Sequence, residues 1–216
     1  MKKYIISLLA ITISAFGQED KNYIGASANG ALFQKVQADI PYADKISHDS
    51  TQPKSILSPG GSVVVGHFFG ISKSPWSVGL ENEASFNYMR LNTSVMSQNP
   101  FVNGRVMDTD IGSFSDSLRG NVGYRIGDFR PYIGTGLGYN YLETYLLNST
   151  QKVSTWIPEG QVFGGVDYYL SPDWALTLEY KYKTTMPVKF DSGKATEVDL
   201  GRMKSHQVQV GFKFLF

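Results

Sequence analysis

The stretch that most constrains the fold is residues 205–216, in which apolar and polar side chains alternate. The even positions hold His206, Val208, Val210, Phe212, Phe214 and Phe216, and the odd positions hold Ser205, Gln207, Gln209, Gly211, Lys213 and Leu215. Successive side chains of a β-strand point to opposite sides, so one side of this stretch is apolar and the other is mostly polar or small. The pattern predicts a strand that separates two different environments.

The same period of two recurs along the chain, whereas no long stretch shows the 3.6-residue period of a helix. No stretch after residue 17 contains eighteen uninterrupted apolar residues, so the sequence predicts no membrane-spanning helix. The alternation predicts eight strands in an all-β chain. They cover residues 23–33, 60–69, 76–91, 112–129, 131–145, 156–169, 174–185 and 205–216.

The connections between these strands alternate in length. Long polar connections are expected at 34–59, 92–111 and 186–204, a medium one at 148–154, and tight turns between the other strands. Transmembrane β-barrels have this asymmetry, with short periplasmic turns and longer extracellular loops. Because backbone amides cannot remain unpaired in hydrocarbon, a chain that crosses a membrane with strands must close into a barrel. We therefore predict an eight-stranded antiparallel up-and-down transmembrane β-barrel.

Alternation alone does not decide which side faces outward, since a lipocalin-like soluble barrel buries its apolar side around a ligand. The polar side is rich in glycine and serine, which suit the small interior of eight strands, and this favours an apolar exterior. Aromatic residues near the strand ends also predict two girdles at the membrane interfaces. The periplasmic girdle would contain Phe68, Phe69, Trp76, Phe129, Tyr132, Tyr168, Tyr169, Trp174, Phe214 and Phe216, and the opposite one Phe33, Phe86, Tyr88, Phe114, Tyr139, Tyr141, Trp156, Tyr180 and Tyr182.

An apolar exterior places a balanced set of charges in the lumen. The expected acids are Glu81, Glu83, Glu159, Asp167 and Glu179, and the expected bases are Arg119, Arg125, Lys181, Lys183 and Lys213. Unpaired buried charges are costly, so we expect ion pairs, with Glu81 and Glu83 near Arg119 or Arg125 and Glu179 near Lys213. Such an interior would plug the barrel. The alternative is an ion-selective constriction.

The first seventeen residues have the layout of a secretory signal peptide. Two lysines precede an uncharged apolar run, and small residues precede Gln18. We expect cleavage of residues 1–17, which leaves residues 18–216 as one barrel domain; a retained N-terminal anchor is the alternative. The formal net charge of +1 disfavours nucleic acid as a partner, and the absence of cysteine excludes disulfides and thiolate metal sites. We expect no cofactor and no metal.

Two short motifs invite catalytic or nucleotide-binding interpretations. The run of alternating glycines at 134–138 lacks the later glycine and the strand-to-helix context of a nucleotide loop, and close packing in the lumen explains it better. Ser205 and His206 suggest a hydrolase, but adjacent residues of a strand point to opposite sides and cannot act together. We expect no catalytic residues.

The last strand resembles the C-terminal assembly signal of bacterial outer-membrane β-barrels, with Gln209, Gly211, Phe214 and Phe216 at the family's positions. More widely, the chain resembles the small OmpA/OmpX-like and opacity-protein barrels, the porin-family surface antigens of Gram-negative bacteria. The stretches that carry this resemblance are 23–27, 78–83, 123–127, 130–139 and 165–170. The resemblance implies location in the bacterial outer membrane and recognition of the last strand by the barrel-assembly machinery.

The resemblance also implies that variable loops are displayed on the cell surface, for adhesion, host-protein binding or membrane integrity. We therefore expect a non-enzymatic protein whose loops 34–59, 92–111 and 186–204 contact host or extracellular proteins, and whose barrel contacts outer-membrane lipid. The main alternative is a small porin or a transport barrel for apolar ligands. An outer-membrane hydrolase is a third possibility.

Overall fold

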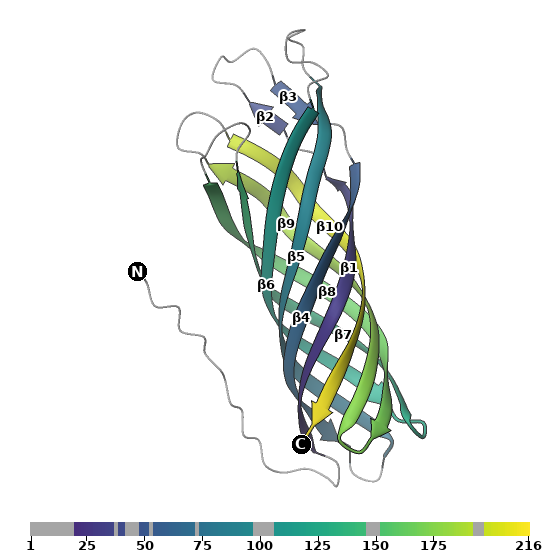
Figure 1. Ribbon diagram of the computed structural model, residues 1–216. Coiled ribbons are helices and arrows are strands. Elements are labelled where there is room, and N and C mark those ends of the chain that lie inside the picture. The colour runs from purple at the N-terminus through teal and green to yellow at the C-terminus, as the bar shows by residue number, and fades with distance from the viewer. Residues whose placement is uncertain are drawn as a thin grey trace.

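The computed structural model describes residues 20–36, 39–41, 48–51, 54–71, 74–96, 106–145, 152–191 and 197–216. Within these residues eight long strands form one closed antiparallel barrel (Figure 1). They are β1 (Lys21–Val36), β4 (Lys54–Gly70), β5 (Trp76–Met96), β6 (Val106–Tyr124), β7 (Phe129–Tyr145), β8 (Lys152–Ser171), β9 (Trp174–Asp191) and β10 (Glu197–Leu215). In the described part of the chain, no helix is long and apolar enough to cross a membrane.

The first and last strands close the barrel. β1 pairs with β10 from Tyr23↔Leu215 to Gln34↔Lys204, and Asn22 and Phe216 exchange two backbone hydrogen bonds of 2.9 Å. Both strand ends therefore lie beside the short connections, at the end where Figure 1 marks the C-terminus. Closure removes the open edge strand that an isolated sheet would expose. The predicted eight-stranded up-and-down barrel is confirmed.

The apolar side of the strands faces outward. Ile133 and Leu137 on β7 are 72% and 74% exposed, whereas Ser85 on β5 and Ser115 on β6 are buried in the lumen and joined by a hydrogen bond of 2.7 Å. The exterior is suited to hydrocarbon and the interior to polar contacts, as the sequence predicts. A soluble barrel with an apolar ligand cavity would have the opposite arrangement.

Most of the predicted girdle aromatics lie on the outer surface, in contact with one another. Trp76 lies 4.9 Å from Tyr124 at the periplasmic end, and Tyr141 lies 5.0 Å from Trp156 near the other end, measured between ring centroids. Four predicted members are wrong, because Phe33, Phe68 and Tyr132 are buried inside the barrel and Tyr169 packs against the buried cluster at its periplasmic end. The prediction used their distance from the strand ends and neglected the side of the strand on which they fall.

The strands continue far into the segments predicted as loops. β5 and β6 stay paired up to Ser94↔Val106, and β9 and β10 up to Glu197↔Asp191. Much of the predicted loops 34–59, 92–111 and 186–204 is therefore strand, and β8 already begins at Lys152, inside the predicted 148–154 connection. Beyond the membrane both sides of a strand can meet water, so the apolar alternation that marks a strand in the sequence is lost there.

Two short strands lie within the first predicted loop. β2 (Asp39–Pro41) pairs with β10 at Asp39↔Asp199, and β3 (His48–Thr51) pairs with β5 at Thr51↔Val95. Above the ends of β1 and β4 the wall thus continues in the order β5-β3-β2-β10, at the top of Figure 1. The first extracellular connection is built into the barrel wall.

One seam of the wall is incomplete. β4 pairs with β5 from Gly70↔Ser77 to Gly60↔Asn87, but its upper part, from Pro59 to Lys54, pairs with β1 alone. Pro59 has no backbone N–H to donate and stands where the pairing with β5 ends. Across this seam the Ser58 hydroxyl donates a hydrogen bond of 2.5 Å to the backbone carbonyl of Tyr88.

Candidate functional site

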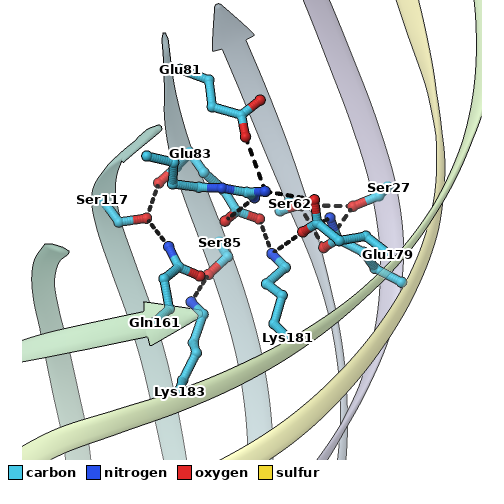
Figure 2. A network of polar contacts seen from close by, with 12 residues as sticks. Ser27, Ser62, Glu81, Glu83, Ser85, Ser117, Gln161, Glu179, Lys181 and Lys183 are labelled. Atoms are coloured by element: carbon cyan, nitrogen blue, oxygen red, sulfur yellow. Dashed lines mark hydrogen bonds and ion pairs between the residues drawn. The ribbon is translucent and has the colours of Figure 1, made fainter. Parts of the chain in front are cut away.

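The middle of the lumen holds a network of five buried charges (Figure 2). Arg119 of β6 pairs with Glu83 at 2.6 Å, with Glu179 at 2.6 Å and with Glu81 at 2.9 Å. Lys181 of β9 donates to Glu83 and lies 3.6 Å from Glu179. The expected pairing of Glu81 and Glu83 with Arg119 is confirmed, and the network joins β5, β6 and β9 across the lumen.

Glycines on β7 make room for this network. A Cβ at Gly136 would lie 2.9 Å from the Cγ of Arg119, and the Arg119 guanidinium lies 3.8 Å from the ring centroid of Phe163. Gly134 and Gly138 likewise face neighbouring strands without space for a side chain. The glycine run at 134–138 therefore packs against the lumen side chains, as the sequence predicts.

Neutral donors complete the central network, which contains three carboxylates and two cations. The phenol of Tyr23 donates to Glu81, and the phenol of Tyr132 donates to Glu179 at 2.8 Å. The amide of Gln209 donates to the other Glu179 oxygen at 3.0 Å. The Tyr23 hydrogen bond satisfies the Glu81 oxygen that Arg119 does not contact, and the other two bonds add donors to the two Glu179 oxygens. The strand position of Tyr23, on the same side as Ser27, is the signal that could have predicted its role.

A second layer lies toward the periplasmic end and is centred on Asp167 of β8. Its carboxylate pairs with Arg130 at 3.2 Å and with Lys213 at 2.9 Å, and the hydroxyl of Thr177 donates to it at 2.7 Å. Arg130 also donates to Asn121 at 2.8 Å. This layer contains two cations and one acid, so it offsets the excess acid of the central network.

Two sequence predictions are corrected in this layer. Arg125 does not face the lumen: β6 ends at Tyr124, and Arg125 is exposed in the following turn, where its Nε donates to the carbonyl of Gly127 at 3.2 Å. Arg130 takes the predicted place, because β7 begins at Phe129 and sets Arg130 on the same side as Tyr132. Lys213 pairs with Asp167, and the expected proximity to Glu179 is wrong.

The third layer lies toward the extracellular end. Lys183 pairs with Glu159 at 3.3 Å and donates to the hydroxyls of Ser85 at 3.2 Å and Ser115 at 3.0 Å. Asn140 donates to the second oxygen of Glu159 at 3.3 Å. A cavity of about 10 Å³ lies beside these residues, which is room for roughly one water molecule.

Apolar side chains close the lumen above and below the three charged layers. The apolar collar at the extracellular end consists of inward-facing, buried residues: Phe33, Ile56, Met89, Ile111, Leu142, Ile157 and Met203. At the periplasmic end Tyr23, Phe68, Ala175 and Leu215 form a buried cluster, in which the rings of Tyr23 and Phe68 stack at 4.3 Å. Below that cluster an open vestibule of about 750 Å³ faces the periplasm.

The arrangement is suited to holding the barrel together. Within the described residues the lumen contains five acids and five bases, with Arg130 in place of Arg125. No group of three His, Cys, Asp or Glu side chains in that part of the chain could hold a metal ion. Ser205 is buried in the lumen, while His206 lies on the outer side between Tyr180 and Tyr182, so the two cannot act together.

A family comparison matches this architecture over almost the whole chain. The model of the outer membrane protein beta-barrel domain matches residues 5–216. The chain belongs to this outer-membrane β-barrel family. It is therefore a protein of the bacterial outer membrane, with the short turns toward the periplasm and the long connections outside the cell. A search of the curated proteins finds no match to it.

Solved structures of small outer-membrane barrels share the fold. Neisserial surface protein A (NspA) is 16% identical, with 90% of this chain and 97% of that chain covered and a TM-score of 0.55. OprG from Pseudomonas aeruginosa is 18% identical, covers 93% and 98%, and has a TM-score of 0.53. Ail, the attachment invasion locus protein of Yersinia pestis, solved with the heparin analogue sucrose octasulfate, is 14% identical, covers 92% and 100%, and has a TM-score of 0.51. At these identities the likeness concerns the fold alone.

The residues of the expected assembly signal divide between the two sides of β10. Gln209 and Gly211 face the lumen, where Gln209 bonds to Glu179. Phe214 and Phe216 face outward, and the Phe214 ring lies 5.0 Å from that of Trp174. This outer-membrane barrel thus presents two aromatic rings at its periplasmic rim, beside the closing seam with β1.

Proposed function

We propose that this outer-membrane barrel is a non-enzymatic surface protein that works through its extracellular rim, in adhesion and contact with host molecules or in the integrity of the membrane. One observation carries the proposal: the lumen is filled by three layers of paired charges and closed by apolar side chains at both ends. A filled interior leaves the exterior ends of the strands as the surface available for partners.

The shape of the rim supports this proposal. The strands extend beyond the outer aromatic girdle, and β2 and β3 tie the first connection into the wall between β10 and β5. A paired strand extension is stiffer than a free loop, so a partner that binds there loses little binding energy to ordering of the chain. The connections within 34–59, 92–111 and 186–204 are the proposed contacts for host or extracellular proteins.

Two cations on the described part of the rim suggest the chemistry of one class of partner. Arg202 and Lys204 are exposed near the extracellular end of β10, and within the described residues neither forms an ion pair. Sulfated or phosphorylated polymers bind such cations, and the fold relative Ail was solved with a heparin analogue. We therefore propose anionic glycans of the host surface as the first partners to test.

The test is adhesion of intact cells that display the protein to a heparin-coated surface. Replacement of residues 97–105 or 192–196 by flexible linkers, and the pair Arg202→Gln and Lys204→Gln, should reduce adhesion without loss of the folded barrel. Arg125→Gln, at the periplasmic rim, is the matched control and should leave adhesion unchanged. Equal adhesion by all variants, or by cells that lack the protein, would refute the adhesion proposal.

The incomplete seam favours a second candidate, transport of small apolar molecules from the outer leaflet. Between β4 and β5, above Gly60↔Asn87, the described wall has no backbone pairing, and the Ser58 hydroxyl bonds across the gap to the Tyr88 carbonyl. Leu57, beside this seam, is 73% exposed on the outer wall. An opening there would lead from the lipid to the apolar collar.

Flux of an apolar fluorescent dye into proteoliposomes separates the two candidates. Under the transport candidate, Ser58→Ala should raise the flux, whereas Ser62→Ala, lower on the same strand where β4 and β5 are paired, should not. If the wild type, Ser58→Ala and Ser62→Ala all give the dye flux of empty liposomes, transport is excluded and the surface role is left.

A further inference from the structure

The outer wall carries a polar pair whose outward neighbours are apolar or small, except for Tyr139, which lies opposite Asp116. Asp116 of β6 is exposed between Phe114 and Leu118, and Asn82 of β5 donates a hydrogen bond of 2.8 Å to its carboxylate. Asp116 is the one carboxylate that the described residues place on the outer wall between the two aromatic girdles. The alternation of the sequence gives no reason for it, since an apolar residue would complete the pattern.

The depth of this pair makes it costly in a single barrel. Asn82 lies midway along β5 between Trp76 at the periplasmic girdle and Tyr88 near the outer one, and Asp116 lies just inside the outer girdle, next to Phe114 and opposite Tyr139. Charged and polar side chains on the lipid side of a barrel destabilise it, most strongly far from the interfaces. An ionisable group within a membrane therefore indicates a partner that removes it from lipid.

Each member of the pair keeps one unused hydrogen-bonding group. The Asn82 amide has a second N–H, and Asp116 has a second oxygen, Oδ2; within the described residues neither group has a partner. The outer wall thus presents a donor and an acceptor side by side. A partner that satisfies both must offer an acceptor opposite Asn82 and a donor opposite Asp116.

A second copy of the same chain meets this requirement. In a closed dimer of two copies inserted in the same direction, the two-fold axis lies along the membrane normal, which keeps each residue at its own depth and exchanges left with right at the contact. Asn82 of one copy then stands opposite Asp116 of the other, and the reverse holds on the other side of the axis. Both unused groups are satisfied at once.

Small residues around the pair allow the two walls to approach. Ala84 is half-buried and lies opposite Asp116 in the pairing of β5 with β6. A Cβ at Gly120 would meet no atom within 4 Å. Small residues at membrane interfaces let backbones come close, and polar side chains then bond between the two subunits. The larger Phe114 and Leu118 flank this flat area and would pack around it.

We propose that β5 and β6 form a homodimer interface in the membrane, in which Asn82 of each copy donates to Asp116 of the other. The inference does not depend on the proposed surface role. It concerns the lipid-facing wall of the barrel, while the adhesion and transport candidates concern its rim and its seam.

Cross-linking tests the proposal, because the chain contains no cysteine and each single variant reports one position. When the whole protein is inserted in lipid vesicles and oxidised, the Ala84→Cys variant should form a disulfide-linked dimer. Leu178→Cys is the matched control: it is lipid-facing on β9, on the opposite wall of the barrel, and should remain monomeric. Equal cross-linking at both positions, or none at position 84, would overturn the proposal.

A second measurement separates dimerisation from folding. Asp116→Leu removes the costly carboxylate from the lipid-facing wall, so the variant should fold at least as well as the wild type by circular dichroism. Its cross-linking through Ala84→Cys should nevertheless fall about tenfold or more, because both interchain hydrogen bonds are lost. A dimer that persists unchanged in Asp116→Leu, or a cross-link to a different protein in whole membranes in place of the dimer, would also overturn the proposal.

Discussion

The guanidinium of Arg119 lies 2.6 Å from Glu83 on the neighbouring strand and 2.6 Å from Glu179 on the far side of the lumen. One side chain therefore connects β6 with both β5 and β9. Backbone hydrogen bonds fix neighbouring strands, but they do not act across the barrel. The charge network supplies that transverse connection and fixes the cross-section of the lumen.

Replacement of Arg119 by leucine should strongly destabilise the barrel. After this change, Lys181 is the only cation of the central network that faces the carboxylates of Glu81, Glu83 and Glu179. Removal of one partner from a buried charge network costs about 3–5 kcal/mol. The free energy of unfolding in urea, measured in lipid vesicles, would report the loss. Arg125→Leu, at the exposed turn, is the control; it loses a hydrogen bond to Gly127 and a cation–π contact with Tyr169 and should lower the free energy of unfolding by only about 1 kcal/mol. Similar losses for both arginines would contradict the assignment of Arg119.

The alternation predicts most of the barrel because membrane and lumen impose opposite chemistry on the two sides of each strand. Leu137 and Gly136, adjacent on β7, illustrate this: one is exposed to lipid and the other packs against Arg119. Nine of the ten expected lumen charges follow from the same rule. The prediction for Arg125 is wrong because the alternation holds only within a strand. β6 ends at Tyr124, and the side on which later residues lie is set by the start of β7.

The apolar ends of the lumen could not be predicted in this way. Leu142 and Met89 are buried in the collar, although they occupy positions where the rule expects polar side chains. Above the membrane an inward apolar residue and an outward polar one are both stable, so the alternation can reverse without cost. The Asn82–Asp116 pair escapes prediction for the opposite reason, since its stability depends on something outside a single chain.

Replacement of Gly136 by valine should destabilise the barrel by overpacking. A Cβ at this position would press on the Cγ of Arg119, and extra atoms in a packed interior cost about 1–3 kcal/mol. Gly112→Val is the matched control, because a Cβ at the outward-facing Gly112 meets no atom within 4 Å. Urea unfolding of both variants in vesicles would check the difference. A Gly136→Val barrel as stable as Gly112→Val would show that the lumen can relax around Arg119.

Phe216→Ala, which keeps the two backbone hydrogen bonds with Asn22, should reduce assembly in cells more than it reduces stability. The side chain is 63% exposed on the outer wall, so the folded barrel loses few contacts with it, whereas the expected assembly signal loses its final aromatic. The amount of folded protein in the outer membrane should fall, while refolding of the purified chain into detergent should stay unchanged. Phe212→Ala is the control on the same side of β10. If both variants assemble equally well, the last residue is not part of the signal.

In planar bilayers the protein should conduct weakly or not at all. An ion that crosses the lumen would have to pass the apolar collar, three layers of paired charges and the Tyr23–Phe68 cluster, and each step removes water from the ion. The space beside Lys183 and Glu159 has a volume of about 10 Å³.

Widening one layer should not open the barrel, because the other barriers act in series with it. Phe33→Ala together with Met203→Ala should enlarge the cavity beside the collar and still give no stable current, since Arg119 and Lys181 remain paired below it. Single-channel recording of the wild type and of this double variant would check both statements. Large and stable currents from the wild type would show that the charged layers rearrange into an ion path, and the lumen would then have to be regarded as a selective pore.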